Sequence, residues 1–344
     1  MSSCTVVEPA DHAVIAASCG WGDNESPPYM AQQLLIDRVG LVAAITAFLA
    51  GNDPRTLDGI RQALEHEIDR AGPSALGDLG ERLAHTGSSW SFFPRDPLAR
   101  RIHHVLADRL LDPTSTLSGV EHLAAIESEP VVILANHLSY SDANLLEVLL
   151  YRSEAVSLAD RLTVVAGPKV YSSLRRRFSS LCFGTIKTAQ SSTFSTDDNG
   201  KNARDVARAA RVAIEIAHER LAKGDAVLIF AEGTRSRTSG LQPMLPAVSR
   251  YLDDSSAWVL PVGIAGTEAL FPIGDHEIHP VRVVAQIGHP VQAASLEERT
   301  SGNRRLMMDV VGVTIAGLLP EEYRGAYGDH VEGLDEARAI AQQL

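Results

Sequence analysis

The sequence predicts an α/β fold, with a mostly parallel sheet flanked by helices and a small N-terminal helical bundle ahead of it. Two observations support this fold class. Apolar residues follow helical spacing from about residue 30 to residue 111, and beyond Pro130 short apolar runs typical of buried strands alternate with helical segments. We therefore expect an N-terminal helical domain over residues 1–115 and an α/β domain with C-terminal helices over residues 116–344.

The N-terminal region predicts four short helices. Apolar residues recur at intervals of three and four, beginning at Met30 and continuing through Leu57, Ile60 and Leu64. Breaks rich in Pro and Gly separate the helices and fall at residues 52–54, 72–73 and 94–97. This region contains no phosphate-binding loop and no metal-ligand spacing.

The α/β region is predicted from short apolar runs and the helical segments between them. The runs that predict strands are 131–135, 162–166, 183–187, 226–230, 259–264 and 281–287. Helical spacing predicts helices over 142–150, 203–221, 303–318 and 333–344. The polar stretch 190–200 has no apolar period and predicts a loop.

Several features favour a cytoplasmic protein that does not span a membrane. The first 17 residues hold no Lys or Arg, so they lack the basic start of a secretory signal. The longest nearly uncharged apolar run, Val39 to Gly51, is 13 residues, whereas a bilayer needs about 20. The three cysteines, Cys4, Cys19 and Cys182, form no CxxC pair and fit a reducing compartment.

Charge is distributed unevenly along the chain. The formal net charge is −12, which argues against a general nucleic-acid-binding protein. Residues 161–223, by contrast, hold 12 Lys or Arg and only five acidic residues. This basic zone predicts a phosphate-bearing or acidic partner, the alternative being basic helix faces that are simply solvated.

A His followed five residues later by an Asp is the first candidate catalytic pattern. Three pairs have this spacing: His103 with Asp108, His137 with Asp142, and His330 with Asp335. Only His137 and Asp142 lie in a strand-to-helix turn, where a loop can bring the two side chains together. The alternative for this pair is a helix N-cap at Asp142 beside a surface histidine.

The His137–Asp142 pair suggests general-base chemistry. A neutral imidazole can accept a proton from an alcohol at neutral pH, and a carboxylate on its other nitrogen fixes the tautomer. The sequence has no GxSxG nucleophile elbow. A hydroxyl of the substrate would then be the nucleophile that attacks an activated acyl group.

The second candidate pattern is Phe-Ala-Glu-Gly-Thr-Arg-Ser-Arg over residues 230–237, directly after a predicted strand. Gly233 permits a close backbone approach, and Arg235 and Arg237 carry forked donors that match phosphate oxygens. The alternative is an ordinary turn at the end of a strand with solvated arginines.

Together these patterns resemble the glycerolipid acyltransferases. The family has a strand leading into Asn-His-x-Ser-x-x-Asp, matched at residues 136–142, and later Phe-x-Glu-Gly-Thr-Arg-Ser, matched at 230–236. A third family block, a strand ending in Pro-Val, is similar to residues 259–263. The match covers residues 130–265 and leaves out the first 110. These enzymes transfer a fatty acyl group from acyl carrier protein or coenzyme A to glycerol 3-phosphate or its lyso derivative.

Within the family, the chain resembles two branches. The soluble plastid-type glycerol-3-phosphate acyltransferases also have a helical domain ahead of the catalytic part. The segment 166–170 of this chain, together with Phe178, Ser179 and Cys182, resembles the corresponding segment of those enzymes. They carry a Lys–His pair where this chain has Lys187-Thr188. The wording Glu-Gly-Thr at 232–234 is typical of the acyltransferases that act on lysophosphatidic acid.

The resemblance implies roles for eight residues. His137 would be the general base and Asp142 the residue that orients it. Arg235 and Arg237 would bind the acceptor phosphate, with Lys187 assisting. The residues that shape the substrate pocket would be Glu232, Gly233 and Thr234.

The expected function is acyl transfer from acyl carrier protein or coenzyme A to the sn-1 hydroxyl of glycerol 3-phosphate in phospholipid biosynthesis, with peripheral membrane contact. Alternatives are acylation of lysophosphatidate or of another hydroxyl or amine, a thioesterase, and a non-catalytic lipid-binding module. No cofactor or metal is expected, because the His-Glu-Ile-His stretch at 276–279 lacks the spacing of a helical zinc site.

Overall fold

The computed structural model describes residues 36–49, 54–189, 203–254, 256–271 and 278–344. The predicted periodic start at Met30, the whole predicted loop at 190–200 and His276 lie outside these residues. Within the described ranges, no helix is both long and apolar enough to cross a bilayer.

Four helices form the N-terminal layer, as predicted. They are α1 (Arg38–Phe48), α2 (Pro54–Ala71), α3 (Pro73–His85) and α4 (Pro97–Leu110). Asp37 and Asp96 cap α1 and α4, because each carboxylate accepts backbone N–H groups of the first helical turn. Pro97 is favourable at the first position of α4, because an N–H group at that position would have no hydrogen-bond partner within the helix.

The centre of the molecule is a mixed sheet, which has nine strands among the described residues. They are β1 (Phe92–Phe93), β2 (Thr116–Ser118), β3 (Val131–Ala135), β4 (Leu162–Ala166), β5 (Gly184–Lys187), β6 (Ala226–Phe230), β7 (Trp258–Ala265), β8 (Val284–Ile287) and β9 (Val291–Gln292). The order is β1-β5-β4-β6-β3-β7-β8-β2, with β9 also paired to β7. Pairs β5–β4, β4–β6, β6–β3, β3–β7 and β8–β2 are parallel, so the predicted mostly parallel sheet is confirmed.

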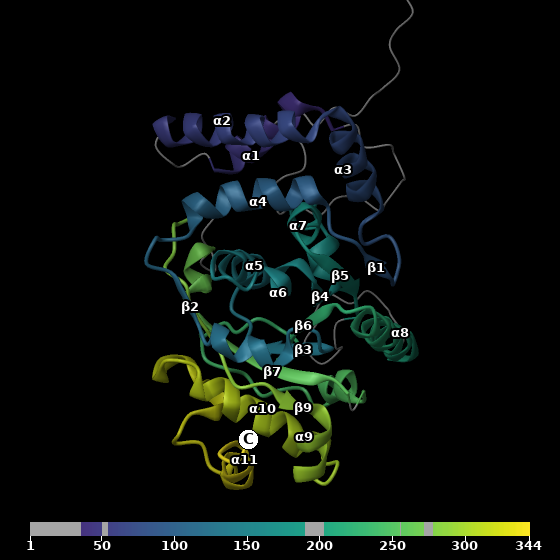
Figure 1. Ribbon diagram of the computed structural model, residues 1–344, viewed down its shortest axis with the longest axis vertical. Helices are drawn as coiled ribbons and strands as arrows, with labels where there is room; N and C mark the ends of the chain where they lie inside the picture. Colours follow the sequence, from purple (N-terminus) through teal and green to yellow (C-terminus); the bar gives the residue numbers. More distant parts are fainter. Residues whose placement is uncertain (1–35, 50–53, 190–202, 255, 272–277) are drawn as a thin grey trace, which may run out of the picture.

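Helices cover both faces of the sheet (Figure 1). The α-helices after β2 are α5 (Asp142–Arg152), α6 (Val156–Asp160), α7 (Leu174–Ser180), α8 (Ala203–Ala222), α9 (Ala293–Arg299), α10 (Arg304–Gly317) and α11 (Asp335–Ala341). The 3₁₀ helices are η1 (Val120–Ile126), η2 (Pro168–Tyr171), η3 (Pro246–Leu252), η4 (Thr267–Leu270), η5 (Glu321–Tyr323) and η6 (Gly325–Tyr327). Figure 1 shows α4 and α5 on one side of the strands and α9, α10 and α11 on the other.

Side chains that alternate along the strands divide the core into two clusters. On β3, Val131, Ile133 and Ala135 pack with α5 and the N-terminal helices, whereas Val132 and Leu134 pack with α8 and α10. The N-terminal helices therefore share one continuous apolar cluster with a face of the sheet. The domain boundary between residues 115 and 116 stays a prediction.

The structure corrects several predicted boundaries. The predicted strand 281–287 is shorter, because only Val284–Ile287 pairs along β7 and Val281 makes a single bridge to Leu111. Strands β1, β2 and β9 and helices α6, α7 and α9 were not predicted. Each is seven residues or fewer, too short for a hydrophobic period to be visible.

Candidate active site

The three predicted motifs meet at one edge of the sheet. Strands β6, β3 and β7 are adjacent and parallel, and Ala135 at the end of β3 is in register with Phe230 on one side and Val262 on the other. The carboxyl ends of parallel strands lie at a common edge, where open α/β sheets bind their ligands. Residues 136–142 and 231–237 follow the ends of β3 and β6, residues 264–267 span the end of β7, and hydrogen bonds join the three segments.

His137 and Asp142 are hydrogen-bonded. The Nδ1 atom of His137 lies 2.8 Å from Oδ2 of Asp142, whose side chain is completely buried. The carboxylate also accepts the backbone N–H groups of Leu138 at 2.7 Å and Ser139 at 3.0 Å, and the hydroxyl of Thr267 at 2.5 Å. Several donors therefore fix the carboxylate, and it in turn fixes the orientation of the imidazole.

The helix-cap alternative for Asp142 is wrong. Ser141 occupies the N-cap position of α5, and Asp142 is the first helical residue. Its carboxylate bonds back to residues 137–139 instead of forward to the first helical turn. The other two pairs of the same spacing do not form this arrangement, because Asp108 pairs with Arg152 and Asp335 pairs with Arg338.

The second ring nitrogen of His137 is available to a substrate. The ring stacks on Phe230, with centroids 4.2 Å apart and planes at 14°. The side chain is 16% exposed, and its Nε2 atom makes no hydrogen bond to any residue that the structure describes. Bonding of Nδ1 to a carboxylate leaves Nε2 as the acceptor in a neutral imidazole. The pair can therefore remove a proton from a hydroxyl placed at Nε2.

Glu232 holds the second motif against the first. Its Oε1 atom accepts the N–H of His137 at 2.6 Å, and its Oε2 atom accepts the N–H of Gln242 at 2.8 Å. The carbonyl of His137 accepts the N–H of Ser236 at 2.8 Å, so both backbone groups of His137 are bound by the 230–237 segment. Burial raises the pKa of Glu232 to about 8, against the opposing effect of the two backbone donors. Both carboxylate oxygens of Glu232 thus accept hydrogen bonds from backbone N–H groups of this chain.

Asn136 joins the first motif to β7. Its side chain donates to the carbonyl of Ile264 at 2.7 Å and accepts the N–H of Ile264 at 2.8 Å. The side chain is buried, so these two bonds satisfy groups that would otherwise be costly to bury. Sequence reasoning missed this role and that of Thr267. The available signal was the amide of Asn136 directly after β3, since the neighbouring strand β7 carries the third motif.

Gly233 is required by the turn after β6. Its φ is +71°, and a Cβ at this position would lie 2.3 Å from Cδ1 of Leu245. Any larger residue would therefore be strained and would clash. Thr234 follows in a half-buried position.

The predicted phosphate-binding cations are found in three different settings. Arg235 is half-buried, with its guanidinium carbon 3.8 Å from the ring centroid of Tyr140, and makes no ion pair with any described residue. Arg237 is exposed. Lys187, at the end of β5, donates to the carbonyl of Gly87 and lies over the ring of Trp90 at 4.9 Å. Strands β4 and β6 lie between β5 and β3. Lys187 therefore lies at the end of a strand three positions along the sheet from the strand that leads into His137.

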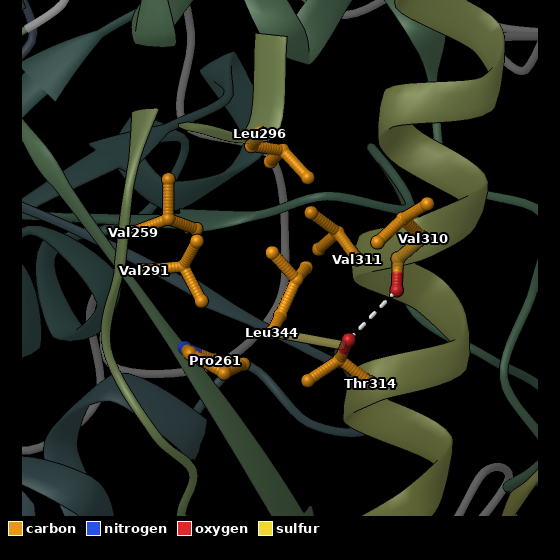
Figure 2. A pocket seen from close by; sticks show the side chains of 8 residues that line it. All are labelled: Val259, Pro261, Val291, Leu296, Val310, Val311, Thr314 and Leu344. Atoms are coloured by element: carbon orange, nitrogen blue, oxygen red, sulfur yellow. Dashed lines mark hydrogen bonds between the residues drawn. The ribbon is translucent and has the colours of Figure 1, made fainter. Parts of the chain in front are cut away.

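Among the described residues, no group of three or more His, Cys, Asp and Glu side chains could hold a metal ion. An apolar pocket lies apart from the predicted site residues. Figure 2 shows a small apolar pocket lined by Val259, Pro261, Val291, Leu296, Val310, Val311, Thr314 and Leu344. It lies on the α10 face of the sheet, whereas α5, which begins with Asp142, packs on the other face. None of the predicted site residues lines it.

The part of the chain that forms this edge of the sheet matches a known protein family. Residues 114–265 match the family described as "Acyltransferase". No curated protein sequence matched the chain. Among solved structures, the 1-acyl-sn-glycerophosphate acyltransferase PlsC from Thermotoga maritima is similar, with 20% identity and a TM-score of 0.42 over 64% of this chain and 80% of that one. The matched range contains all three motifs, as the resemblance predicted. Residues 114–265 of this chain therefore match an acyltransferase domain.

Proposed function

We propose that this acyltransferase moves a fatty acyl group from an acyl thioester, of acyl carrier protein or coenzyme A, to the sn-1 hydroxyl of glycerol 3-phosphate. The observation that carries the proposal is the 2.8 Å bond between His137 and the buried Asp142, inside the matched domain. Among the described residues no serine or cysteine bonds to Nε2 of His137, which suits a reaction in which the substrate supplies the hydroxyl.

The proposed reaction begins with proton transfer. Nε2 of His137 takes the proton of the acceptor hydroxyl as its oxygen attacks the thioester carbonyl carbon. Asp142, bonded to Nδ1, stabilises the imidazolium that forms. The tetrahedral intermediate collapses with cleavage of the carbon–sulfur bond, and the imidazolium returns the proton to the thiolate. The products are an ester and a free thiol, so every atom and charge is accounted for.

The cations near this edge suit a phosphate-bearing acceptor. Arg235 lies between Glu232 and Ser236, which bind the two backbone groups of His137, and its guanidinium lies over the ring of Tyr140 in the loop that follows His137. In this proposal Arg235 and Arg237 bind the acceptor phosphate and Lys187 assists from β5. The basic zone at 161–223 suits the anionic donor, since coenzyme A and acyl carrier protein are both negatively charged.

A second acceptor is favoured by one sequence feature. The wording Glu-Gly-Thr at 232–234 is typical of acyltransferases that act on lysophosphatidate, so 1-acylglycerol 3-phosphate is the alternative acceptor. Both acceptors carry a phosphate monoester and a free hydroxyl, and both yield a lipid. We therefore expect the enzyme to work in the cytoplasm with peripheral contact to a membrane surface.

The test is thiol release from palmitoyl-coenzyme A and palmitoyl-acyl carrier protein, each with glycerol 3-phosphate, 1-acylglycerol 3-phosphate or no acceptor. Release that requires glycerol 3-phosphate supports the proposal, and release only with the lyso derivative supports the second acceptor. Equal release without acceptor would identify a thioesterase. Absence of release under every condition would contradict both proposals and favour a lipid-binding role.

A further inference from the structure

Tyr140 carries two arginines on its ring. The guanidinium carbon of Arg235 lies 3.8 Å from the ring centroid, and that of Arg176 lies 4.5 Å from it. The two guanidinium carbons are therefore at most about 8 Å apart. Arg235 follows β6 and Arg176 lies on α7, so this arrangement is produced by the fold and not by sequence proximity. All three side chains are half-buried.

The position of Arg176 is fixed by local bonds. Its Nη1 atom donates to the carbonyl of Lys169 and to the hydroxyl of Ser172, both at 3.2 Å. The other side of the pair is fixed by Glu232, which ties the segment that carries Arg235 to His137. Two cations are thus held close together on the ring of Tyr140, in the loop that carries the candidate base.

We propose that Arg176, Tyr140 and Arg235 form the binding site for the phosphate monoester of the acceptor, with Arg176 as a binding residue in addition to those assigned above. This inference rests on the proposed function. A phosphate dianion between the two forks is attracted by both cations. Guanidinium groups match phosphate oxygens with paired, charge-assisted hydrogen bonds. Because the two guanidinium carbons are no more than about 8 Å apart, a single phosphate can contact both groups.

The acceptor phosphate fits this position better than the 3′-phosphate of coenzyme A. Tyr140 lies in the same loop as His137 and Asp142, so the site is close to the reacting hydroxyl. In glycerol 3-phosphate a short three-carbon chain separates that hydroxyl from the phosphate. The 3′-phosphate of coenzyme A lies at the far end of the long pantetheine arm from the thioester.

The same geometry gives the N-terminal helices a role. Helix α7 carries three consecutive arginines, and those flanking Arg176 contact the N-terminal layer. Arg175 lies over the ring of Phe48 in α1 at 4.8 Å, and Arg177 donates to the carbonyl of Leu83 in α3 at 3.1 Å. The N-terminal helices therefore hold α7, and through it they position Arg176 at the site.

The test is equilibrium binding, because it does not depend on turnover. Dissociation constants for glycerol 3-phosphate, 1-acylglycerol 3-phosphate and coenzyme A are measured by calorimetry on wild type, Arg176→Gln and Arg176→Lys. The control is Arg61→Gln, an exposed arginine of α2 that pairs only with Asp58 among the described residues. Tyr140→Phe keeps the ring face and Tyr140→Leu removes it. Thermal unfolding of each variant reports any general loss of folding.

We expect Arg176→Gln to weaken binding of the phosphate-bearing acceptor by about tenfold to a hundredfold, the usual effect of losing a charged hydrogen bond. Arg176→Lys should recover part of this loss, Tyr140→Leu should weaken binding severalfold and by more than Tyr140→Phe, and Arg61→Gln should match wild type. Coenzyme A should bind equally to all of them.

Two results would overturn the inference. One is unchanged acceptor binding in Arg176→Gln. The other is a loss confined to coenzyme A, which would assign the site to the donor. Failure of the proposed function is a separate result, namely the absence of acyl transfer by wild type to either acceptor.

Discussion

Helix α5 carries two buried carboxylates that look alike and have different surroundings. Asp142 begins the helix and Glu147 lies five residues further on, and both side chains are completely buried. Each accepts a hydrogen bond from a histidine at 2.8 Å, Asp142 from His137 and Glu147 from His104. The histidine–carboxylate contact is therefore present twice within one helix.

The difference between the two carboxylates is in their remaining partners. Glu147 faces α4, where it also pairs with Arg100 at 2.7 Å. Burial alone would raise the pKa of Glu147, and the bonds from His104 and Arg100 hold it below its usual value. Asp142 has backbone N–H groups and the hydroxyl of Thr267 as its other partners. Among the described residues its recorded partners are thus dipoles and His137 and include no arginine, which suits the proposed role of stabilising an imidazolium.

The comparison shows that the same histidine–carboxylate hydrogen bond occurs in two different settings, and only one of them suits the proposed base. The pair at the strand end leaves one ring nitrogen of His137 without a hydrogen bond among the described residues. The pair between α4 and α5 includes a cation and joins two helices, so it has the properties of a structural ion cluster.

The largest expected effect separates the two histidines. His137→Ala should lower the acyl-transfer rate by about 10²–10⁴-fold, the usual contribution of a positioned general base, with little change in unfolding temperature. His104→Ala should retain transfer within a few-fold and lower the free energy of unfolding, since Glu147 then keeps only Arg100. Rate and thermal unfolding measured on both variants check this. Equal rate losses in the two variants would remove the distinction between the pairs.

Asp142→Asn should lower the transfer rate by about 10²–10³-fold. A carboxylate only accepts hydrogen bonds and therefore keeps the proton on Nδ1 of His137. The NH₂ group of an amide can donate to Nδ1 instead, which favours the tautomer with its proton on Nε2 and blocks the base. The measurement is kcat/KM for the acceptor at a fixed thioester concentration. A variant with wild-type kcat/KM would show that the orientation of His137 does not depend on this carboxylate.

Glu147→Gln should cost stability instead of rate. Removing the buried charge leaves Asp160 as the ion-pair partner of Arg100, and we expect the free energy of unfolding to fall by about 2 kcal/mol. Glu65→Gln is the matched control, because Glu65 is an exposed partner of Arg38 and should change stability by less than about 0.5 kcal/mol. Urea unfolding of both variants tests this. Equal midpoints would mean that the buried cluster contributes no more than a surface pair.

Glu232 predicts a pH dependence of stability. Burial raises its pKa in the folded protein to about 8, from 4.5 as the ordinary value. Between these values the unfolded chain releases the proton that the folded protein retains, so stability falls as pH rises through this window and levels off above it. We expect wild type to lose more than about 1 kcal/mol between pH 5 and pH 8 relative to Glu232→Gln. Parallel pH profiles for the two proteins would contradict the raised pKa.

Much of the fold could be predicted because local patterns encode it. Strand β3 is five consecutive buried apolar residues, and the N-terminal helices show their period directly. Strand β1 could not be predicted, since Phe92–Phe93 is a strand only through its pairing with β5. The same holds for β2 and β9, which depend on β8 and β7.

The candidate site was predictable where its residues are neighbours in the chain. His137 and Asp142 lie in one loop, so spacing and context were enough to pair them. The bonds of Asn136 to Ile264 and of Asp142 to Thr267 span 128 and 125 residues, and no local pattern reports them. Arg176 was one basic residue among many until the fold placed it on the ring of Tyr140.

The most direct test of the central claim is the transfer rate of the double variant His137→Ala with Asp142→Asn, compared with each single variant. If Asp142 acts through His137, then removing it after His137 is gone has no further effect, and the double variant transfers as slowly as His137→Ala alone. Losses that multiply in the double variant would show that the two residues act independently and would contradict the assignment of this pair as base and orienting residue.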